Sequence, residues 1–125
     1  MGEKIKYHTD LEAYQIAFDA VMQIFEITKS FPKEEIYSLI DQIRRSSRSV
    51  CANLSEAWRR RRYPAAFKNC LNLAEAEAAE TQVWISFSRE GAYMTENEID
   101  PLVHSCDHIL GIIVKMIKHS DKWII

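Results

Sequence analysis

The sequence predicts an all-α domain folded as an up-down-up-down antiparallel four-helix bundle. The 125 residues include only three glycines and three prolines, too few for the many tight turns of an all-β fold of this length. Apolar residues recur at spacings of three, four and seven through most of the chain, and the breaks between these patterns are short. With 47% hydrophobic residues, residues 1–125 are expected to form a single domain with its own core.

The first helix is expected over about 10–30, between a cap at Thr9 or Asp10 and the Phe31-Pro32 stop. Its main inward stripe is predicted to be Leu11, Tyr14, Phe18, Val21 and Phe25. A second apolar stripe, largely on the other side, consists of Ala13, Ile16, Ala20, Ile24 and Ile27. A helix on the surface of a monomer needs only one such stripe. We therefore expect another subunit to cover part of the second stripe, with Ile16 and Ala20 at the contact.

The second helix is expected over about 34–62, before Tyr63-Pro64. Its apolar face is predicted to be Ile36, Ile40, Ile43, Val50 and Leu54, with Ser47 among them. Residues 44–62 contain seven arginines and one acid, Glu56, although the whole chain carries a formal charge of -2. At about 100° per residue, four arginines share one stripe and Arg45 lies beside it: Arg44, Arg48, Arg59 and Arg62. The helix is thus predicted to have a core side and a basic side.

The third helix is expected over about 64–90, ending at Gly91. Six residues are predicted to face inward: Phe67, Leu71, Ala74, Ala78, Thr81 and Ile85. A second apolar group, Leu73, Trp84 and Phe87, shares a lateral face with Glu77 and Glu80. Exposed aromatic side chains bordered by acids are typical of a contact between subunits.

The fourth helix is expected over about 96–119, with Thr95 and Glu98 forming a capping box. It has one continuous apolar face, and His104 and His108 lie on the opposite side. The final residues, 120–125, are apolar enough to fold over the end of the bundle.

The sequence gives little indication of catalysis. It has no Glu-x-x-His pair of the kind that di-metal bundles use, no nucleophile elbow and no glycine-rich phosphate loop. Cys51, Cys70 and Cys106 lack C-x-x-C spacing and are interpreted as buried free thiols. We expect no catalytic residue, no metal and no cofactor. Apolar runs too short for a bilayer, and an N-terminus without the apolar centre of a signal peptide, predict a cytoplasmic protein without a membrane partner.

Four segments carry a resemblance to a known family: FPKEE (31–35), QIRRSSRSVCANLSEAWRRRRYPAAF (42–67), EAAETQVWISFSREGAY (77–93) and Trp123. Together they resemble the bacterial four-helix-bundle proteins called 23S rRNA-intervening-sequence proteins. That family tends to have Q-x-R-R-A-x-x-S-I-x-A-N-I-A-E-G in the second helix and E-x-x-T-Q in the third. This chain differs at Arg48 and Cys51, where the family commonly has an apolar residue and Pro, and at Ala57-Trp58, where Gly is common.

The resemblance implies a homopentameric ring of bundles. The chain is also similar to the accessory proteins of diversity-generating retroelements, which are basic pentamers that bind nucleic acid and a reverse transcriptase. The family name records that some of its genes lie inside 23S rRNA genes, and it does not establish an activity.

Two functions are therefore compared. In the first, the protein binds RNA or DNA through its phosphate backbone, because clustered arginines displace counterions and match phosphate oxygens. The residues predicted to bind are Arg44, Arg45, Arg48, Arg59, Arg60 and Arg62. In the alternative, the protein is an interaction scaffold that holds a protein partner, and the arginines pair with Glu75, Glu77 and Glu80 of another subunit.

Overall fold

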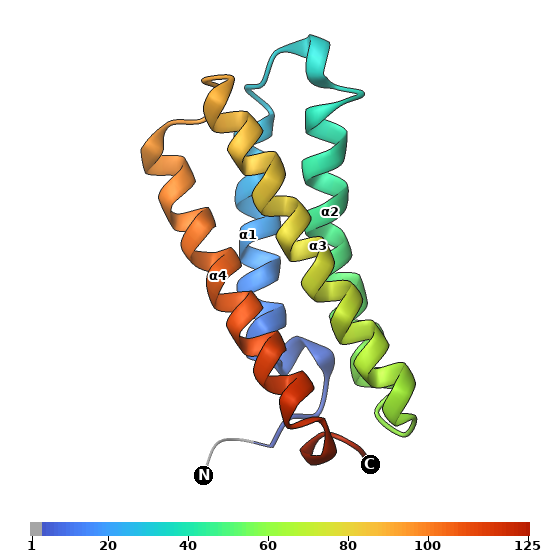
Figure 1. Cartoon of the computed structure of the whole chain (residues 1–125). Coiled ribbons are helices and arrows are strands. Elements are labelled where there is room, and N and C mark those ends of the chain that lie inside the picture. Colours follow the sequence, from blue (N-terminus) through green and yellow to red (C-terminus); the bar gives the residue numbers. More distant parts are fainter. Residues whose placement is uncertain (1–3) are drawn as a thin grey trace.

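The computed structural model describes residues 4–125 and shows an antiparallel four-helix bundle (Figure 1). The α-helices are α1 (Glu12–Thr28), α2 (Leu39–Arg59), α3 (Pro64–Glu90) and α4 (Glu96–Lys118). Short 3₁₀ helices are η1 (His8–Asp10), η2 (Lys33–Glu35) and η3 (Ser120–Lys122). Each helix packs against the next one along the chain, and α4 packs against α1 to close the bundle. The predicted all-α fold class is confirmed.

The second helix is shorter than the predicted span 34–62 at both ends. Residues 33–35 form η2, and the following turn leaves Ile36 exposed instead of on the core face. A tertiary contact holds this corner, because the Tyr93 hydroxyl donates a hydrogen bond to Glu35 Oε2 over 3.0 Å. At the other end, Arg60 departs from helical geometry with φ -102° and ψ 18°. Arg62 therefore lies in the turn before α3 and not on a helical stripe.

The first helix presents to the core the stripe that the sequence assigned to its outer side. Its buried residues are Ala13, Ala17, Ala20, Ile24 and Thr28. Small side chains allow α1 to approach its neighbours closely, so the alanines lie inside while Phe18 remains 48% exposed. Ala20 is only 5% exposed within a single chain, so its predicted place at a subunit contact is wrong. Ile16 is half-buried and packs against the core of its own chain.

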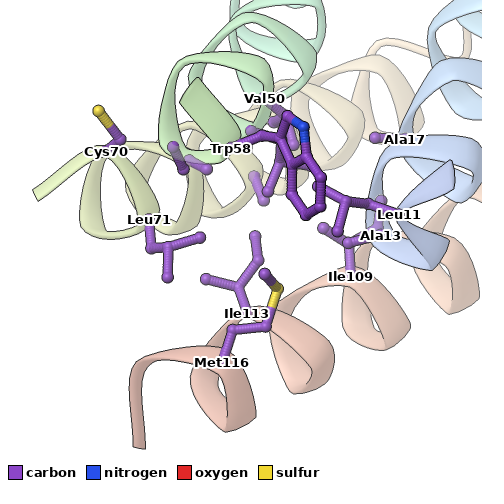
Figure 2. Packing of buried hydrophobic residues seen from close by; sticks show 14 of the residues in the cluster. Leu11, Ala13, Ala17, Val50, Trp58, Cys70, Leu71, Ile109, Ile113 and Met116 are labelled. Atoms are coloured by element: carbon purple, nitrogen blue, oxygen red, sulfur yellow. The ribbon is translucent and has the colours of Figure 1, made fainter. Parts of the chain in front are cut away.

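The core contains two clusters of buried side chains along the bundle axis. The first contains Trp58, Ile109 and Ile113 (Figure 2). Leu54 also belongs to it. The second lies at the end of the bundle that carries the α1–α2 and α3–α4 connections, and it includes Ile43 of α2 and Ile99 of α4. All six residues predicted to face inward from α3 are buried, which confirms its inner face.

Candidate nucleic-acid interface

The six predicted binding arginines fall into two groups on α2 and the turn after it. Arg44, Arg45 and Arg48 lie in the first half of the helix. Arg59 is its last residue, and Arg60 and Arg62 follow it. With a rise of about 1.5 Å per residue, Arg48 and Arg59 are separated by roughly 16 Å along the helix axis. The arginines thus form two basic regions instead of one continuous stripe.

The first region opens on a surface depression of about 650 Å³ between the end of α1, the α1–α2 connection and α2. We call it the basic depression. Five of its lining residues are cationic and one is acidic; the lining consists of Thr28, Lys29, Phe31, Lys33, Ile36, Ile40, Asp41, Arg44, Arg45 and Arg48. Lys29 and Lys33 were not among the predicted binding residues, because they precede α2 and approach its arginines only in the folded chain. Concentrated positive charge in a concave surface favours binding of an anion.

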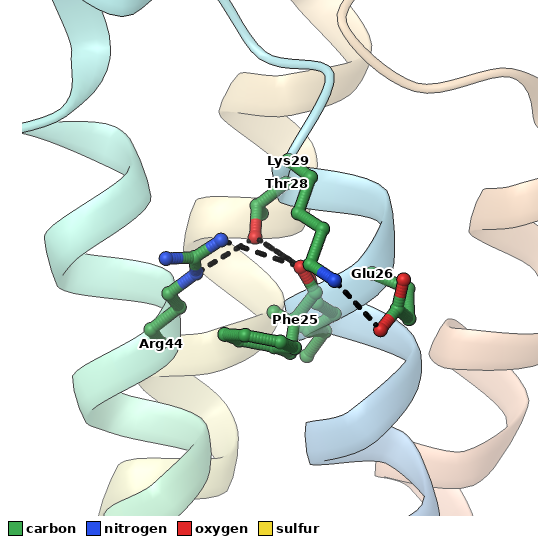
Figure 3. Close-up of polar contacts among 6 residues, drawn as sticks. Phe25, Glu26, Thr28, Lys29 and Arg44 are labelled. Carbon is green, nitrogen blue, oxygen red and sulfur yellow. Dashed lines mark hydrogen bonds and ion pairs between the residues drawn. The ribbon is translucent and has the colours of Figure 1, made fainter.

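Arg44 is half-buried and holds α1 against α2 (Figure 3). Its Nε donates to Thr28 Oγ1 over 2.9 Å, and its Nη2 donates to the Phe25 carbonyl over 3.3 Å. The guanidinium carbon lies 4.7 Å from the centre of the Phe25 ring. Because the Phe25 carbonyl belongs to the last turn of α1, Arg44 supplies both a hydrogen bond and a positive charge to a helix C-terminus. Arg44 thus has a structural role, which the prediction of a side chain clear of the core did not anticipate.

Arg45 and Arg48, in contrast, are exposed. Within residues 4–125, neither side chain takes part in a hydrogen bond or an ion pair. The two ion pairs in this part of the chain join Lys29 to Glu26 and Arg89 to Glu96. The charges of Arg45 and Arg48 are therefore available to a ligand.

The second region also combines one structural arginine with exposed ones. Arg61 Nε donates to the Trp58 carbonyl over 2.8 Å, and its guanidinium carbon lies 3.4 Å from the centre of the Trp58 ring. Burial, followed by the nearby charge of Arg59, lowers the pKa of Arg61. Arg59, Arg60 and Arg62 are exposed, and Arg62 lies 5.9 Å from the Tyr63 ring.

The acidic and apolar face predicted on α3 is largely at the surface. Leu73 is 47% exposed and Phe87 is 59% exposed. Trp84 is half-buried, with its Nε1 3.2 Å from Glu80 Oε1 and its ring 5.9 Å from that of Phe87. Glu77 is half-buried on the same helix. Leu73 and Phe87, rather than Trp84, thus form the accessible part of this face.

Most of the chain matches a known protein family. A family model described as 23S rRNA-intervening sequence protein matches residues 9–115. The chain belongs to this family. It is also similar to a crystal structure from Bacteroides thetaiotaomicron, a protein of unknown function from the S23 ribosomal protein family. That likeness has a TM-score of 0.76 and 24% sequence identity, and it covers 85% of this chain and 95% of the other, which shows a shared fold. No curated protein matches the chain.

This member of the 23S rRNA-intervening sequence protein family keeps a regular α2 through the positions where its sequence is unusual. The helix continues through Cys51, and Trp58 is 6% exposed in the first core cluster. Arg48, where an apolar residue is common, adds a positive charge to the lining of the basic depression. Trp58 thus contributes to packing, and Arg48 contributes to surface charge.

The remaining reactive groups are not arranged for metal or thiol chemistry in the part of the chain that the structure covers. Burial raises the pKa of Cys106 to about 11, and burial has the same effect on Cys51, so both thiols are protonated near neutral pH. Among residues 4–125, no cluster of three or more His, Cys, Asp or Glu side chains is placed to hold a metal ion. No described helix is long and apolar enough to span a membrane.

Proposed function

We propose that this protein binds RNA through the phosphate backbone, using the exposed arginines at the two ends of α2, and that it acts by binding and not by catalysis. The observation that carries the proposal is the combination of exposure and missing partners. Arg45, Arg48, Arg59, Arg60 and Arg62 are all exposed, and none pairs with a carboxylate within residues 4–125. An acidic chain that keeps five guanidinium groups unneutralised in two exposed basic regions is well suited to a polyanion.

RNA is taken as the first ligand, and DNA, which presents the same phosphate chemistry, is its comparison. The family name records a gene location and the structural neighbour shows a shared fold, so neither distinguishes RNA from DNA. A DNA strand of the same sequence is the appropriate competitor, because equal affinity would indicate that the protein recognises phosphates alone.

The proposal is tested by measuring RNA affinity at several salt concentrations. Each phosphate contact with a single strand contributes about -0.7 to the slope of log K against log salt. The double variant Arg45→Gln/Arg48→Gln should reduce the steepness of that slope by about 1.4. The matched control is Lys115→Gln/Lys118→Gln, which removes the same charge from exposed positions on α4. Absent binding, binding independent of salt, or equal effects of the two double variants would contradict the proposal.

We also propose that the protein assembles into a ring of identical subunits, a pentamer according to the family resemblance. The exposed Leu73 and Phe87, together with Glu77 and Glu80, would contact a different surface of the next copy, apart from the five exposed arginines. A repeated contact between two different patches forms a ring when it closes. The ring would repeat the basic regions, so weak RNA contacts would add through multivalency.

The assembly is tested by the mass of the particle in solution. Leu73→Ala/Phe87→Ala should yield a smaller particle by light scattering, because both side chains are largely outside the core of the single chain. Val114→Ala, on α4 and 39% exposed, is the control. An unchanged mass for the double variant would show that this face is not the subunit contact.

The second candidate function is a protein-interaction scaffold, in which the arginines serve subunit contacts. The apolar and acidic face of α3 favours it, because that surface is suited to protein and not to RNA. The two functions give different results in the experiments above. A stable oligomer that does not bind RNA at any salt concentration would favour the scaffold.

A further inference from the structure

We infer that the basic depression binds single-stranded RNA, with phosphates inside it and one unpaired base stacked on Tyr37 at its edge. This inference rests on the proposed RNA binding and narrows its ligand. It assigns this role to the first basic region, because that region combines a depression with an exposed aliphatic side chain, Ile36, and an exposed aromatic residue that follows it in the sequence, Tyr37.

The shape of the depression favours a single strand. Its volume of about 650 Å³ is within the range of roughly 300–1,000 Å³ that is typical of small-molecule sites. A flexible strand can lay a phosphate and its neighbouring nucleotides into such a concavity. A duplex presents its phosphates on a convex and stiff surface, so it can contact the rim but cannot fill the depression.

The charges inside the depression are arranged for phosphate. Arg45 and Arg48 provide exposed guanidinium groups, while Arg44 is already held by Thr28 and Phe25. The two hydrogen bonds of Arg44 leave most of its N–H groups free for a ligand. Holding a donor in place before binding reduces the conformational entropy lost when a phosphate arrives.

An exposed aromatic residue follows one of the lining residues of the depression in the sequence. Ile36 contributes to the lining and is 45% exposed, and Tyr37 follows it with 94% of its surface exposed. Within residues 4–125 the Tyr37 side chain makes no hydrogen bond and no ring contact. Single exposed aromatic residues are common on protein surfaces. This one directly follows Ile36, a lining residue of a depression with five cationic side chains. That sequence position points to a nucleobase, because stacking on a ring next to a basic groove is how single strands are held.

The test compares two RNA probes by fluorescence anisotropy: an oligouridine of roughly 16 nucleotides, which remains unpaired, and a hairpin stem with a similar number of phosphates. The oligouridine should bind more tightly. Tyr37→Ala should weaken oligouridine binding roughly five- to a hundredfold and leave stem binding unchanged, while Tyr37→Trp should retain it. The matched control is Tyr7→Ala, which removes a tyrosine that is 64% exposed near the N-terminus.

Each contrary result has a distinct meaning. If both probes bind equally and Tyr37→Ala changes neither affinity, the inference is wrong, while salt-dependent binding that needs Arg45 and Arg48 still supports the proposed function. If Tyr37→Ala weakens both probes alike, or if Tyr7→Ala has the same effect, stacking at the depression is refuted. If neither probe binds, the proposed function and this inference fail together.

Discussion

Replacing Arg44 by glutamine should lower the free energy of unfolding by about 2 kcal/mol. The Nε bond to Thr28 Oγ1 is 2.9 Å long and comes from a charged donor, and such bonds contribute about 1.5–3 kcal/mol. We take the lower end because the site is only half-buried. The weaker bond to Phe25 and the contact with its ring add about 0.5–1 kcal/mol. Glutamine is too short and uncharged to replace these contacts.

The assay is urea unfolding followed by circular dichroism at a fixed protein concentration, since assembly would make stability depend on concentration. In thermal unfolding, with an unfolding entropy of about 2.1 cal/mol/K per residue, a loss of 2 kcal/mol corresponds to a fall in Tm of roughly 8 °C for this chain. The control is Arg45→Gln, at the next position, where the side chain is exposed and unpaired. That variant should remain within about 0.5 kcal/mol of the wild type.

The two variants should differ in stability. Arg45→Gln, which retains stability, should weaken RNA binding and lower its salt dependence. If Arg44→Gln is as stable as Arg45→Gln, the structural role of Arg44 is wrong.

Three further predictions concern the fold. Thr81→Val and Ser46→Ala should each lower the free energy of unfolding by about 1 kcal/mol, because each breaks the buried 2.8 Å hydrogen bond between the two hydroxyls. In a double-mutant cycle, the double variant should lose less than the sum of the two single losses. Additive losses would show that the hydroxyls are not coupled. The hydrogen bonds that the Glu35 carboxylate accepts lower its pKa in the folded protein. The ionised carboxylate therefore stabilises the fold above the pKa of the unfolded state, and this contribution is lost as the pH falls through the pKa of the folded state. Tyr93→Phe should therefore reduce the acid sensitivity of unfolding, and an unchanged pH profile would contradict this. Cys106 should react with iodoacetamide much more slowly in the native protein than in denaturant, since it is buried and burial raises its pKa to about 11. The rates are measured by mass spectrometry, and equal rates would show that the thiol is accessible.

Local signals in the sequence were sufficient for the helices and most of their faces. Thr95 and Glu98 form the predicted capping box at the start of α4. Pro64 begins α3 as expected, because proline suits the first turn of a helix. These features depend on residues within one turn of each other, so the sequence alone contains the information that specifies them.

The predictions for the inner face of α1 and for the start of α2 were wrong because contacts between residues far apart in the sequence determine the structure there. On α1, hydrophobicity ranked Phe18 above Ala17, but close packing against two neighbouring helices favours the smaller side chain. The start of α2 is influenced by Tyr93, which lies 58 positions from Glu35. No local pattern carries that contact.

The candidate site was predictable in composition but not in shape. The arginines of α2 were evident from the sequence, and their charge indicated an anionic partner. The depression itself requires the end of α1, because Lys29 and Lys33 complete its lining. The roles of individual arginines also depend on the fold, since Arg44 reaches Thr28 only when α1 and α2 are packed together.

The response of RNA binding to salt distinguishes the local basic regions from the charge of the whole protein. The chain has a formal charge of -2, so its net charge repels RNA, and added salt would strengthen binding if net charge controlled it. At physiological ionic strength, however, charges interact over only about 8 Å, which isolates exposed arginines from acids elsewhere on the bundle. Contacts from five arginines would give a slope near -3.5, so raising the salt concentration about fourfold should weaken binding roughly a hundredfold. Affinity that rises with salt would show that the arginines do not contact phosphates.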